Sequence, residues 1–341
     1  MPIKRVQEAI EAIKQGEMVI MVDDEDRENE GDLVYAATFT TPEKVNFMAS
    51  EAKGLICVAL ERDAAKRLEL NPMVPRNTSS YETAFTVSVD ARDATTGISA
   101  HERDMTIRLL ADPHSKAEEL VRPGHIFPLI AKDGGVLNRI GHTEGSVDLC
   151  KLAGLAGVGV ICEIMKEDGT MARRDDLDIF AKKHNLKIVQ ISDIIEYRMQ
   201  RESLIKEISR EHITFFGHDV EKAEYIDHLG RRHSLMLFGT PGNKANVKFH
   251  NISKDVDFLQ NEEQFNGLLG AVDYLKENGG VMVFLDNTLV NDTAIKEFGI
   301  GAQILKSLGI EQINLIATKK VKELAGLSGF NLAIDEEIIL R

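Results

Sequence analysis

The stretch Asp23-Asp-Glu-Asp-Arg-Glu-Asn-Glu-Gly-Asp32 places seven carboxylates and one arginine within ten residues. The flanking residues 17–22 and 33–39 are apolar and predicted to form strands, so the acidic stretch is predicted to be a loop held between two strands. Loops fixed by a scaffold commonly carry binding and catalytic residues. Because carboxylates a few Å apart repel one another in a partly dry site, we expect a cation or a positively charged ligand to neutralise them.

The residues alone leave three interpretations of this acidic loop. Most acidic runs are solvated surface or disordered segments. In a calcium-binding loop, Asp26, Glu28 and Glu30 would supply early ligands, but Ala37 falls where a bidentate Glu is required. A magnesium site would use one or two of the carboxylates and meet a phosphorylated substrate, and Arg27 supports it because a guanidinium can contact a phosphate.

Length and composition predict a soluble globular chain of two domains. The chain has 341 residues, of which 43% are hydrophobic and 28% charged. The net charge of −14 argues against non-specific nucleic-acid binding, although a local positive pocket can still bind a small anionic substrate. No apolar stretch is long enough to span a bilayer, and residues 1–10 are typical of an amphipathic helix rather than a signal peptide. We therefore expect neither nucleic acid nor membrane as a partner.

The cysteines indicate a reducing environment. Cys57, Cys150 and Cys162 show no CxxC spacing, so neither a zinc knuckle nor a disulfide framework is predicted. A cytoplasmic location fits this cysteine usage best. Cys57, in the middle of a predicted strand, is by default a small core residue.

The first 200 residues alternate helix-like and strand-like segments, which indicates an α/β domain. Helices are predicted at 6–14, from Pro42 (with Thr41 as its N-cap) to near Gly54, from Glu102, and at 147–155, 175–184 and 192–210. Strands are predicted at 18–22, 33–39, 55–60, 84–89, 158–165 and 187–191. A domain boundary is placed near residue 205, which gives domains 1–205 and 206–341. The second domain is predicted to hold strands at 213–216, 234–238, 281–285 and 313–317 and helices at 263–277 and 293–308.

The segment Arg139-Ile-Gly-His-Thr-Glu144 precedes a predicted helix and is a candidate anion site. The first turn of a helix has free N–H groups and a positive dipole. Arg139 and Thr143 would hold a phosphate, Gly141 would let the backbone approach it, and His142 could ligate a metal. The alternative is a plain N-cap at Thr143 beside a surface histidine.

Three further positions could carry chemistry. His125 lies in RPGHIFPL, a predicted loop braced by two prolines. It could act as a general acid or base, but a histidine in such a place is more commonly a structural hydrogen-bonding residue. Glu163 lies in an apolar strand, where a carboxylate needs a cationic partner, a proton or a place in a site. The hydroxyl-rich turn at 95–99 could bind substrate oxygens or cap the following helix.

Taken together, the motifs resemble one enzyme family. DDEDRENEGD at 23–32, GLIC at 54–57, TTGIS at 95–99, RPGHIFPL at 122–129, GGVL and RIGHTE within 134–144, and CEIM at 162–165 occur in the order and spacing of 3,4-dihydroxy-2-butanone 4-phosphate synthase. The resemblance covers about residues 1–200 and implies an α/β (α+β) domain with a mixed sheet flanked by helices, in a homodimer. It further implies a formate-releasing lyase of riboflavin biosynthesis, which converts D-ribulose 5-phosphate to 3,4-dihydroxy-2-butanone 4-phosphate with Mg²⁺ or Mn²⁺.

The resemblance also implies roles for individual residues. The metal ligands of the family match Glu28 and His142. Its substrate contacts match Arg27, Glu28, Asp32, Thr96, Arg139, Gly141, His142 and Thr143. Its residues for turnover match His125 and Glu163, and Glu30, Cys57 and Glu144 are assigned to the same pocket. Glu102 is a small departure, because relatives more often carry Asp there.

The second half resembles a GTP cyclohydrolase II domain that has lost its chemistry. The best match is Gly299-Ile-Gly-Ala-Gln-Ile-Leu-Lys-Ser-Leu-Gly309, continued through residues 315–327. That family binds zinc through three cysteines, yet no cysteine follows residue 162, and LDNTLVNDTAIKEF at 285–298 stands where its catalytic signature QEGRGIGL is expected. We therefore expect no zinc, no GTP hydrolysis, and a smaller α+β domain kept for dimerisation, stability or regulation. A bifunctional enzyme with scattered histidines as metal ligands, and a non-catalytic phosphosugar-binding protein, are the alternatives.

Overall fold

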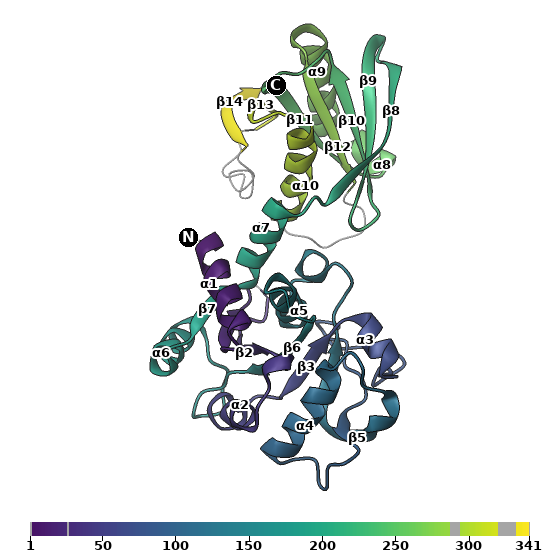
Figure 1. The fold of residues 1–341 in the computed structure, drawn as a ribbon. Coiled ribbons are helices and arrows are strands. Elements are labelled where there is room, and N and C mark those ends of the chain that lie inside the picture. Colours follow the sequence, from purple (N-terminus) through teal and green to yellow (C-terminus); the bar gives the residue numbers. More distant parts are fainter. Residues whose placement is uncertain (1, 26, 287–293, 320–331, 341) are drawn as a thin grey trace. The chain divides into compact units, whose positions relative to one another are not determined.

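The computed structural model describes residues 2–25, 27–286, 294–319 and 332–340, with the side chains of 294–298 left out. Two parts of the sequence used above lie outside the described residues. They are Asp26, which the calcium-loop interpretation used, and much of residues 285–298, which stand where the signature QEGRGIGL is expected. The chain divides into two compact units, Met1–Tyr197 and Arg198–Arg341, whereas the sequence placed the boundary near residue 205. Helix α7 (Ile191–Arg201) spans this division (Figure 1).

The first unit is built on a seven-stranded mixed sheet with the order β4-β5-β3-β6-β2-β1-β7. Its strands are β1 (Val19–Val22), β2 (Gly31–Ala36), β3 (Cys57–Leu60), β4 (Val89–Ala91), β5 (Leu120–Ile130), β6 (Val158–Glu163) and β7 (Lys187–Gln190). The pairs β1–β7 and β3–β5 are parallel, and the other neighbours run antiparallel. The predicted mixed sheet flanked by helices is therefore confirmed.

Helices cover this sheet and close its apolar core. They are α1 (Pro2–Lys14), α2 (Pro42–Phe47), α3 (Arg62–Arg67), α4 (Ala100–Ala111), α5 (His142–Leu152), α6 (Arg174–His184) and α7. Helix α2 begins as predicted, because the Thr41 side chain accepts a hydrogen bond from Lys44 N and Pro42 occupies the first helical position. A five-residue π-helical turn, Met48–Ala52, ends this helix, and Lys53 adopts a left-handed conformation (φ 70°).

Strand β5 corrects the prediction of a loop at residues 122–129. The strand bulges between its pairing positions with β4, and the side chains of Ser88 and Asp90 accept hydrogen bonds from the displaced amides of Gly124 and His125. Prolines remove backbone donors but keep their carbonyl acceptors, so a bulged strand tolerates them. The predicted strand at 84–89 was also misplaced, because β4 starts only at its end.

The second unit holds another seven-stranded sheet, with the order β14-β13-β11-β12-β10-β9-β8. Its strands are β8 (Ile205–Phe215), β9 (His218–Asp227), β10 (Arg232–Phe238), β11 (Lys244–Ile252), β12 (Gly280–Asp286), β13 (Gln312–Ala317) and β14 (Ala333–Ile339). Its helices are α8 (Asp255–Gln260), α9 (Glu262–Asn278) and α10 (Ala294–Ser307). The four strands and two helices predicted for this half are present, and β9, β11, α8 and β14 were missed.

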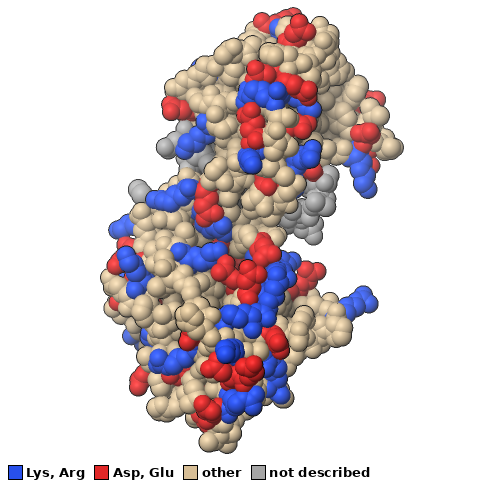
Figure 2. Space-filling view, turned by 45° about the vertical axis from the view of Figure 1, so that its right-hand side comes forward, with Lys and Arg blue, Asp and Glu red and all other residues tan. Residues whose placement is uncertain are grey.

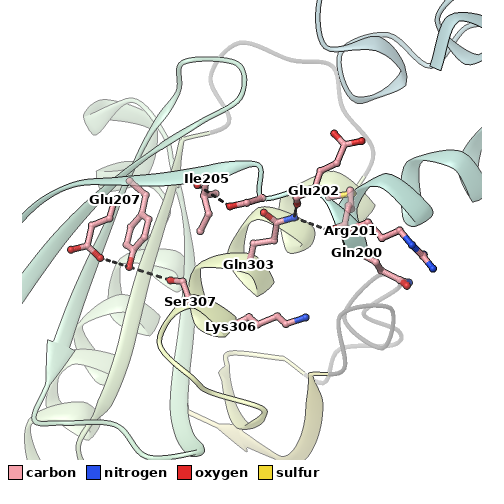
Figure 3. Close-up of a pocket in the computed structure, with 11 residues that line it drawn as sticks. Gln200, Arg201, Glu202, Ile205, Glu207, Gln303, Lys306 and Ser307 are labelled. Atoms are coloured by element: carbon pink, nitrogen blue, oxygen red, sulfur yellow. Dashed lines mark hydrogen bonds between the residues drawn. The ribbon is translucent and has the colours of Figure 1, made fainter. Parts of the chain in front are cut away.

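The predicted helix at 192–210 is wrong beyond Arg201, because β8 follows almost at once. A side chain about 100 residues away ends the helix: Gln303 Nε2 donates to the carbonyls of Met199 (2.7 Å) and Glu202 (2.8 Å). Its Oε1 accepts from Leu204 N at 2.8 Å. Gln303 thus satisfies carbonyls at the end of α7 and the amide of Leu204 shortly beyond it (Figure 3).

Two surface properties bear on possible partners. None of the helices among the described residues is long and apolar enough to cross a membrane. On the face drawn in Figure 2, Lys and Arg side chains lie interspersed with Asp and Glu rather than gathered into one basic stripe.

Candidate active site

The acidic loop between β1 and β2 is a fixed structure organised by Asp23. One carboxylate oxygen of Asp23 accepts from Arg27 Nη1 (2.8 Å) and Glu28 N (3.1 Å), and the other accepts from Glu30 N (2.8 Å). Its side chain is only 1% exposed. From outside the loop, Arg173 Nη1 donates to the carbonyls of Glu28 and Asn29. These bonds hold Asp23 and residues 27–30 in a fixed arrangement, unlike a disordered segment, while Asp24 and Glu25 are exposed.

The segment before α5 is also buried rather than on the surface. Gly141 is the N-cap and His142 is the first helical residue, so the alternative with Thr143 as N-cap is wrong. The His142 side chain is 7% exposed, so it is not a surface histidine either. Arg139 Nη1 forms a 2.6 Å ion pair with Glu144, whose side chain is 1% exposed.

The two segments enclose a cavity of about 130 Å³. Nine residues expected in the site line it: Arg27, Glu28, Glu30, Asp32, Cys57, Arg139, His142, Thr143 and Glu163. Four residues line it that the sequence did not single out: Thr83, Phe85, Leu129 and Ile161. Leu129 and Ile161 follow from strand alternation once the sheet is known, whereas nothing local in the sequence marks Thr83 and Phe85.

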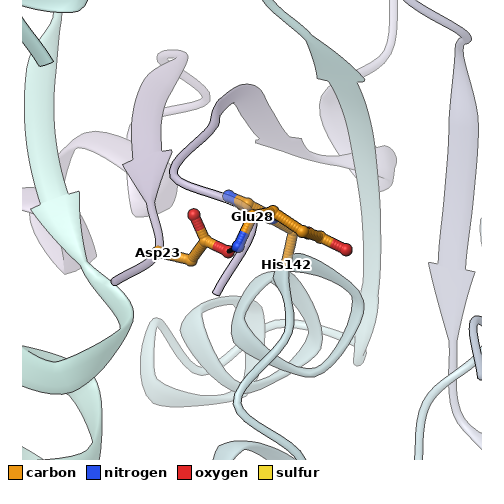
Figure 4. A group of neighbouring side chains, drawn as sticks. All are labelled: Asp23, Glu28 and His142. Carbon is orange, nitrogen blue, oxygen red and sulfur yellow. Dashed lines mark hydrogen bonds and ion pairs between the residues drawn. The ribbon is translucent and has the colours of Figure 1, made fainter. Parts of the chain in front are cut away.

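Asp23, Glu28 and His142 form a group with the chemistry of a divalent-cation site (Figure 4). Each offers one ligand atom, and these atoms all lie within 4.8 Å of one another. His142 Nδ1 lies 3.6 Å from Glu28 Oε2. Glu28 and His142 were expected here, but Asp23 was not. Asp23 directly follows β1, and nothing in the sequence distinguishes it from the six other carboxylates of the acidic loop.

Unmet hydrogen-bonding capacity supports a cation at this position. Among the described residues, Asp32 Oδ1 and His142 Nε2 are buried without a hydrogen-bond partner, and they lie 3.9 Å apart. Buried polar atoms are normally paired, so unpaired ones facing a cavity indicate a missing ligand or ion. Two carboxylates and an imidazole form a donor set that suits Mg²⁺ and, because of the histidine, also Mn²⁺.

The carboxylates of the cavity are held in different protonation states. Burial, together with the charges of Glu163, Glu28 and Glu30, raises the pKa of Asp32 to about 7. Burial opposes the ionised form of Glu28 as well, but the hydrogen bond from His142 and the charge of Arg27 bring its pKa below the usual value. Burial and the neighbouring Glu28 raise the pKa of Glu30.

His142 and Cys57 complete the electrostatics of the cavity. Burial alone would lower the pKa of His142, but Asp32, Glu28 and Asp23 outweigh it and raise that pKa to about 9. Burial and the charges of Glu163 and Asp32 raise the pKa of Cys57 well above its ordinary value, so its side chain is a neutral thiol. An imidazole that gives up its proton can take a cation in its place.

Glu163 lines the cavity while also holding a structural bond. Its Oε2 accepts from Leu55 N at 2.8 Å, so the carboxylate in the apolar strand has a backbone partner. A Cβ atom added at Gly54 would lie only 2.3 Å from the carbonyl oxygen of Glu163, which is too close for any side chain. Gly54 is therefore required for this close approach of the two segments, which fixes where Glu163 points.

His125 and Thr96 do not line the cavity. His125 Nδ1 lies 2.7 Å from Asp90 Oδ2 on the neighbouring strand, and the His125 side chain is 43% exposed. Thr96 Oγ1 lies 3.4 Å from Glu102 Oε2 in the turn before α4. Asp90, the partner of His125, was missed because its role depends on the bulge in β5. Gly141 contributes through its backbone as the N-cap of α5.

The second unit holds a larger cavity of about 370 Å³ beside Gln303 (Figure 3). Tyr225 Oη, on its wall, hydrogen-bonds with Glu207 (2.9 Å) and Ser307 (3.3 Å). The buried amide of Gln303 makes three hydrogen bonds at the end of α7, so Gln303 and Tyr225 on this wall serve the fold.

Comparisons with known proteins agree with the geometry. The model of the 3,4-dihydroxy-2-butanone 4-phosphate synthase family matches residues 7–197, and that of GTP cyclohydrolase II matches residues 258–339. The chain is 61% identical to a 3,4-dihydroxy-2-butanone 4-phosphate synthase of Sulfurospirillum multivorans, covering 97% of this chain and 93% of the relative. It is 57% identical to a protein of the same name from Wolinella succinogenes, covering 100% and 98%.

Solved structures extend the similarity to three dimensions. RibBX of A. baumannii, a two-domain 3,4-dihydroxy-2-butanone 4-phosphate synthase, is 40% identical and superposes with a TM-score of 0.85 over 99% of this chain and 100% of its own. A synthase solved with two magnesium ions is 42% identical, with a TM-score of 0.55 over 57% of this chain and 97% of its own. The two-domain match supports the predicted α/β plus smaller α+β architecture.

Proposed function

This chain belongs to the 3,4-dihydroxy-2-butanone 4-phosphate synthase family, and on that premise we propose that it converts D-ribulose 5-phosphate to 3,4-dihydroxy-2-butanone 4-phosphate and formate. The observation that carries the proposal is the cavity, which gathers four carboxylates, His142 and two arginines in one enclosed space. A phosphosugar needs cations at one end, and its rearrangement needs groups that exchange protons at the other.

The metal of the site would be Mg²⁺ or Mn²⁺. Glu28 and His142 would hold it, joined by Asp23, since their ligand atoms converge. A bound divalent cation supplies a Lewis acid for the sugar oxygens. A synthase similar in structure was solved with two magnesium ions, which supports this choice for the present chain.

The proton transfers fall to groups of the cavity with different pKa values. Forming an enediol from a ketose needs a base for a carbon-bound proton, and loss of water needs an acid. Without a bound cation the pKa of Asp32 is about 7, so Asp32 is assigned an exchange of protons near neutral pH, whereas Glu28 stays ionised. Glu163 and Glu30, which line the same cavity, are assigned the remaining exchanges, and the neutral thiol of Cys57 lies against the substrate.

The phosphate end of the substrate is assigned to Arg27, Arg139 and the start of α5. Arg27 lines the cavity with its side chain 11% exposed, so its charge acts in a partly dry space. Thr143 adds a hydroxyl, and the first turn of α5, which Gly141 caps, adds backbone N–H groups of a helix N-terminus, although the N–H of Gly141 itself donates to the carbonyl of Arg139. This arrangement matches the needs of a dianionic phosphate.

His125 and Thr96 are proposed to act from a second copy in a homodimer. Within one chain they lie outside the cavity, and His125 is oriented by Asp90 on an exposed part of β5. Mixing H125A with E28Q tests this directly. Each variant alone is expected to be inactive, and subunit exchange should restore up to about a quarter of wild-type activity, since mixed dimers would hold one intact site. No recovery in proven mixed dimers would contradict shared sites.

The test of the reaction is formate release from D-ribulose 5-phosphate by the full chain, with Mg²⁺ and with EDTA. Formate that appears with Mg²⁺ and disappears with EDTA supports the proposal. Folded protein that releases no formate contradicts it and favours a non-catalytic phosphosugar-binding protein.

The second domain is proposed to have lost GTP hydrolysis. It matches the GTP cyclohydrolase II model, but its part of the sequence contains no cysteine to bind the zinc of that family. A bifunctional enzyme would need another metal site, so zinc analysis of the purified protein separates the two cases. Heat on titration with millimolar GTP would reveal residual nucleotide binding, and absence of heat would discard a nucleotide-regulated domain.

A further inference from the structure

The segment that follows α3 lies against both arginines of the cavity, although no motif marks it. It is mostly exposed and irregular from Asn71 onward, and its end supplies Thr83 and Phe85 to the cavity wall. It is braced internally, because Asn77 Nδ2 donates to the carbonyl of Thr83 at 2.9 Å. Asn77 Oδ1 also accepts from Ser79 N at 2.9 Å.

Tyr81 contacts Arg27 in two ways. Its hydroxyl donates to the carbonyl of Arg27 at 2.9 Å, which ties it to the acidic loop. Its ring lies under the guanidinium, with the Arg27 Cζ atom 5.1 Å from the ring centre. The hydroxyl thus fixes the backbone of Arg27 and the ring supports the charged group.

The same segment contacts Arg139. Its Nη2 donates to the carbonyl of Tyr81 at 3.0 Å and to Thr83 Oγ1 at 3.3 Å. With Nε also 3.3 Å from the carbonyl of Tyr81 and Nη1 donating to Glu144, the plane of the guanidinium is set from both sides. One N–H of Nη1 is left to meet the substrate. Glu82, between the two contacting residues, has a left-handed backbone (φ 52°), a conformation uncommon outside glycine, and its side chain takes no part in the contacts with Arg139.

Two guanidinium groups bind one phosphate well only if their planes are set in advance. Arg side chains have large rotamer freedom, and a fork that is already fixed loses less of it on binding. Resting on the function proposed above, we propose that Tyr81 and Thr83 are positioning residues for the substrate phosphate. They hold Arg27 and Arg139 in the geometry that binds the phosphate of the phosphosugar.

Four variants of the full chain test this. Y81F removes the hydrogen bond to the Arg27 carbonyl and keeps the ring, and Y81A removes both. T83V removes the side-chain hydroxyl that accepts from Arg139 and keeps the Tyr81 carbonyl. E82Q is the matched control, because the Glu82 side chain is 71% exposed and forms a 3.4 Å ion pair with Lys132, away from both arginines. We measure KM and kcat for formate release and, independently of activity, the Kd of inorganic phosphate by calorimetry.

The expected result is a split between binding and turnover. KM and the phosphate Kd should rise about fivefold in Y81F and T83V and about thirtyfold in Y81A, with kcat within about threefold of wild type. E82Q should stay within about twofold of wild type in every constant, and the thermal midpoints of the variants should be unchanged.

Three other results separate the positioning role from the proposed reaction. Unchanged KM and phosphate Kd in Y81A and T83V overturn the positioning role while the proposed reaction stands. If wild-type protein releases no formate but binds phosphate, and Y81A weakens that binding, the reaction fails and the positioning role holds. Wild-type protein that releases no formate and binds no phosphate at millimolar concentration overturns both.

Discussion

In the first unit, Asp32 and His142 are buried beside a cavity with polar atoms that lack partners among the described residues. In the second unit, Asp227, Arg231 and His233 are buried just as deeply. His233 Nε2 also lacks a hydrogen-bond partner among the described residues, but here the three side chains lie against one another. Arg231 Nε donates to Asp227 Oδ2 at 2.7 Å, and His233 Nε2 lies 3.3 Å from the same oxygen.

The two clusters differ in whether the buried carboxylate is fully hydrogen-bonded within the chain, and this distinguishes a structural cluster from a binding site. Asp227 Oδ1 also accepts from two backbone amides, those of Leu229 (2.9 Å) and Arg231 (2.8 Å), so its carboxylate is fully engaged. Although burial opposes its charge, hydrogen bonds from His233 and Arg231 hold the pKa of Asp227 below the usual range. The buried charges of Asp227 and Arg231 are paired with each other and serve the fold. The unpaired atoms of Asp32 and His142 lie beside a cavity, where a ligand can bind them.

Glu28→Gln gives the largest expected effect. Loss of the carboxylate charge removes a ligand of the cation cluster and a partner of Arg27, so turnover should fall at least about a thousandfold while the fold is kept. Formate assays and circular dichroism measure the two properties. E25Q is the control, since Glu25 is exposed on the same loop and should leave activity within about twofold. Near-normal activity of E28Q would remove the metal assignment.

Asp227→Asn should lower the stability of the second unit and leave turnover unchanged, the reverse of Glu28→Gln. It leaves Arg231 as an uncompensated buried cation, which typically costs about 3–5 kcal/mol. The unfolding midpoint assigned to the second unit should therefore drop, while kcat measured below that transition is unchanged. D219N, at an exposed site on the neighbouring hairpin, should leave the midpoint where it is. A stable D227N protein with lost activity would reverse the comparison.

Magnesium should stabilise only the unit that has a place for it. A ligand present at a hundred times its Kd stabilises the folded state by about 2.7 kcal/mol, so the midpoint of the first unit should rise by several degrees. E28Q should abolish this shift, and D227N should keep it. Differential scanning calorimetry with Mg²⁺ and with EDTA makes the comparison. A magnesium shift that survives E28Q would place the cation elsewhere.

Glu102→Gln should have the smallest effect, limited to the turn at 95–99. Hydrogen bonds from Thr95 and Ser99 lower the pKa of Glu102 to about 2. This carboxylate therefore stabilises the fold above its unfolded pKa, and that contribution is lost as the pH falls toward 2. E102Q should lower the midpoint by about 1–2 °C at pH 7, and the difference from wild type should shrink by pH 3. A difference that is constant with pH would show that the charge is irrelevant.

The sequence was sufficient for features set by local patterns. The alternation of segments predicted the first domain, Thr41-Pro42 predicted the start of α2, and flanking apolar residues predicted the acidic loop. These features depend on residues close in sequence, and nine of the expected site residues meet in one cavity. The resemblance to one family supplied the site roles.

What the sequence could not show depends on distant partners. Helix α7 stops at Arg201 because Gln303 binds its last carbonyls, and helix propensity contains no such information. The bulge of β5 depends on Ser88 and Asp90. Tyr81 reaches Arg27 across 54 positions of sequence, so no spacing rule could have revealed that contact.

The most direct test of the account places wild type, E28Q and D227N side by side, below any unfolding transition, with D-ribulose 5-phosphate and Mg²⁺. The account predicts formate from wild type and D227N at similar rates and none above background from E28Q. Formate from E28Q at a near wild-type rate, or none from folded wild-type protein, would contradict it.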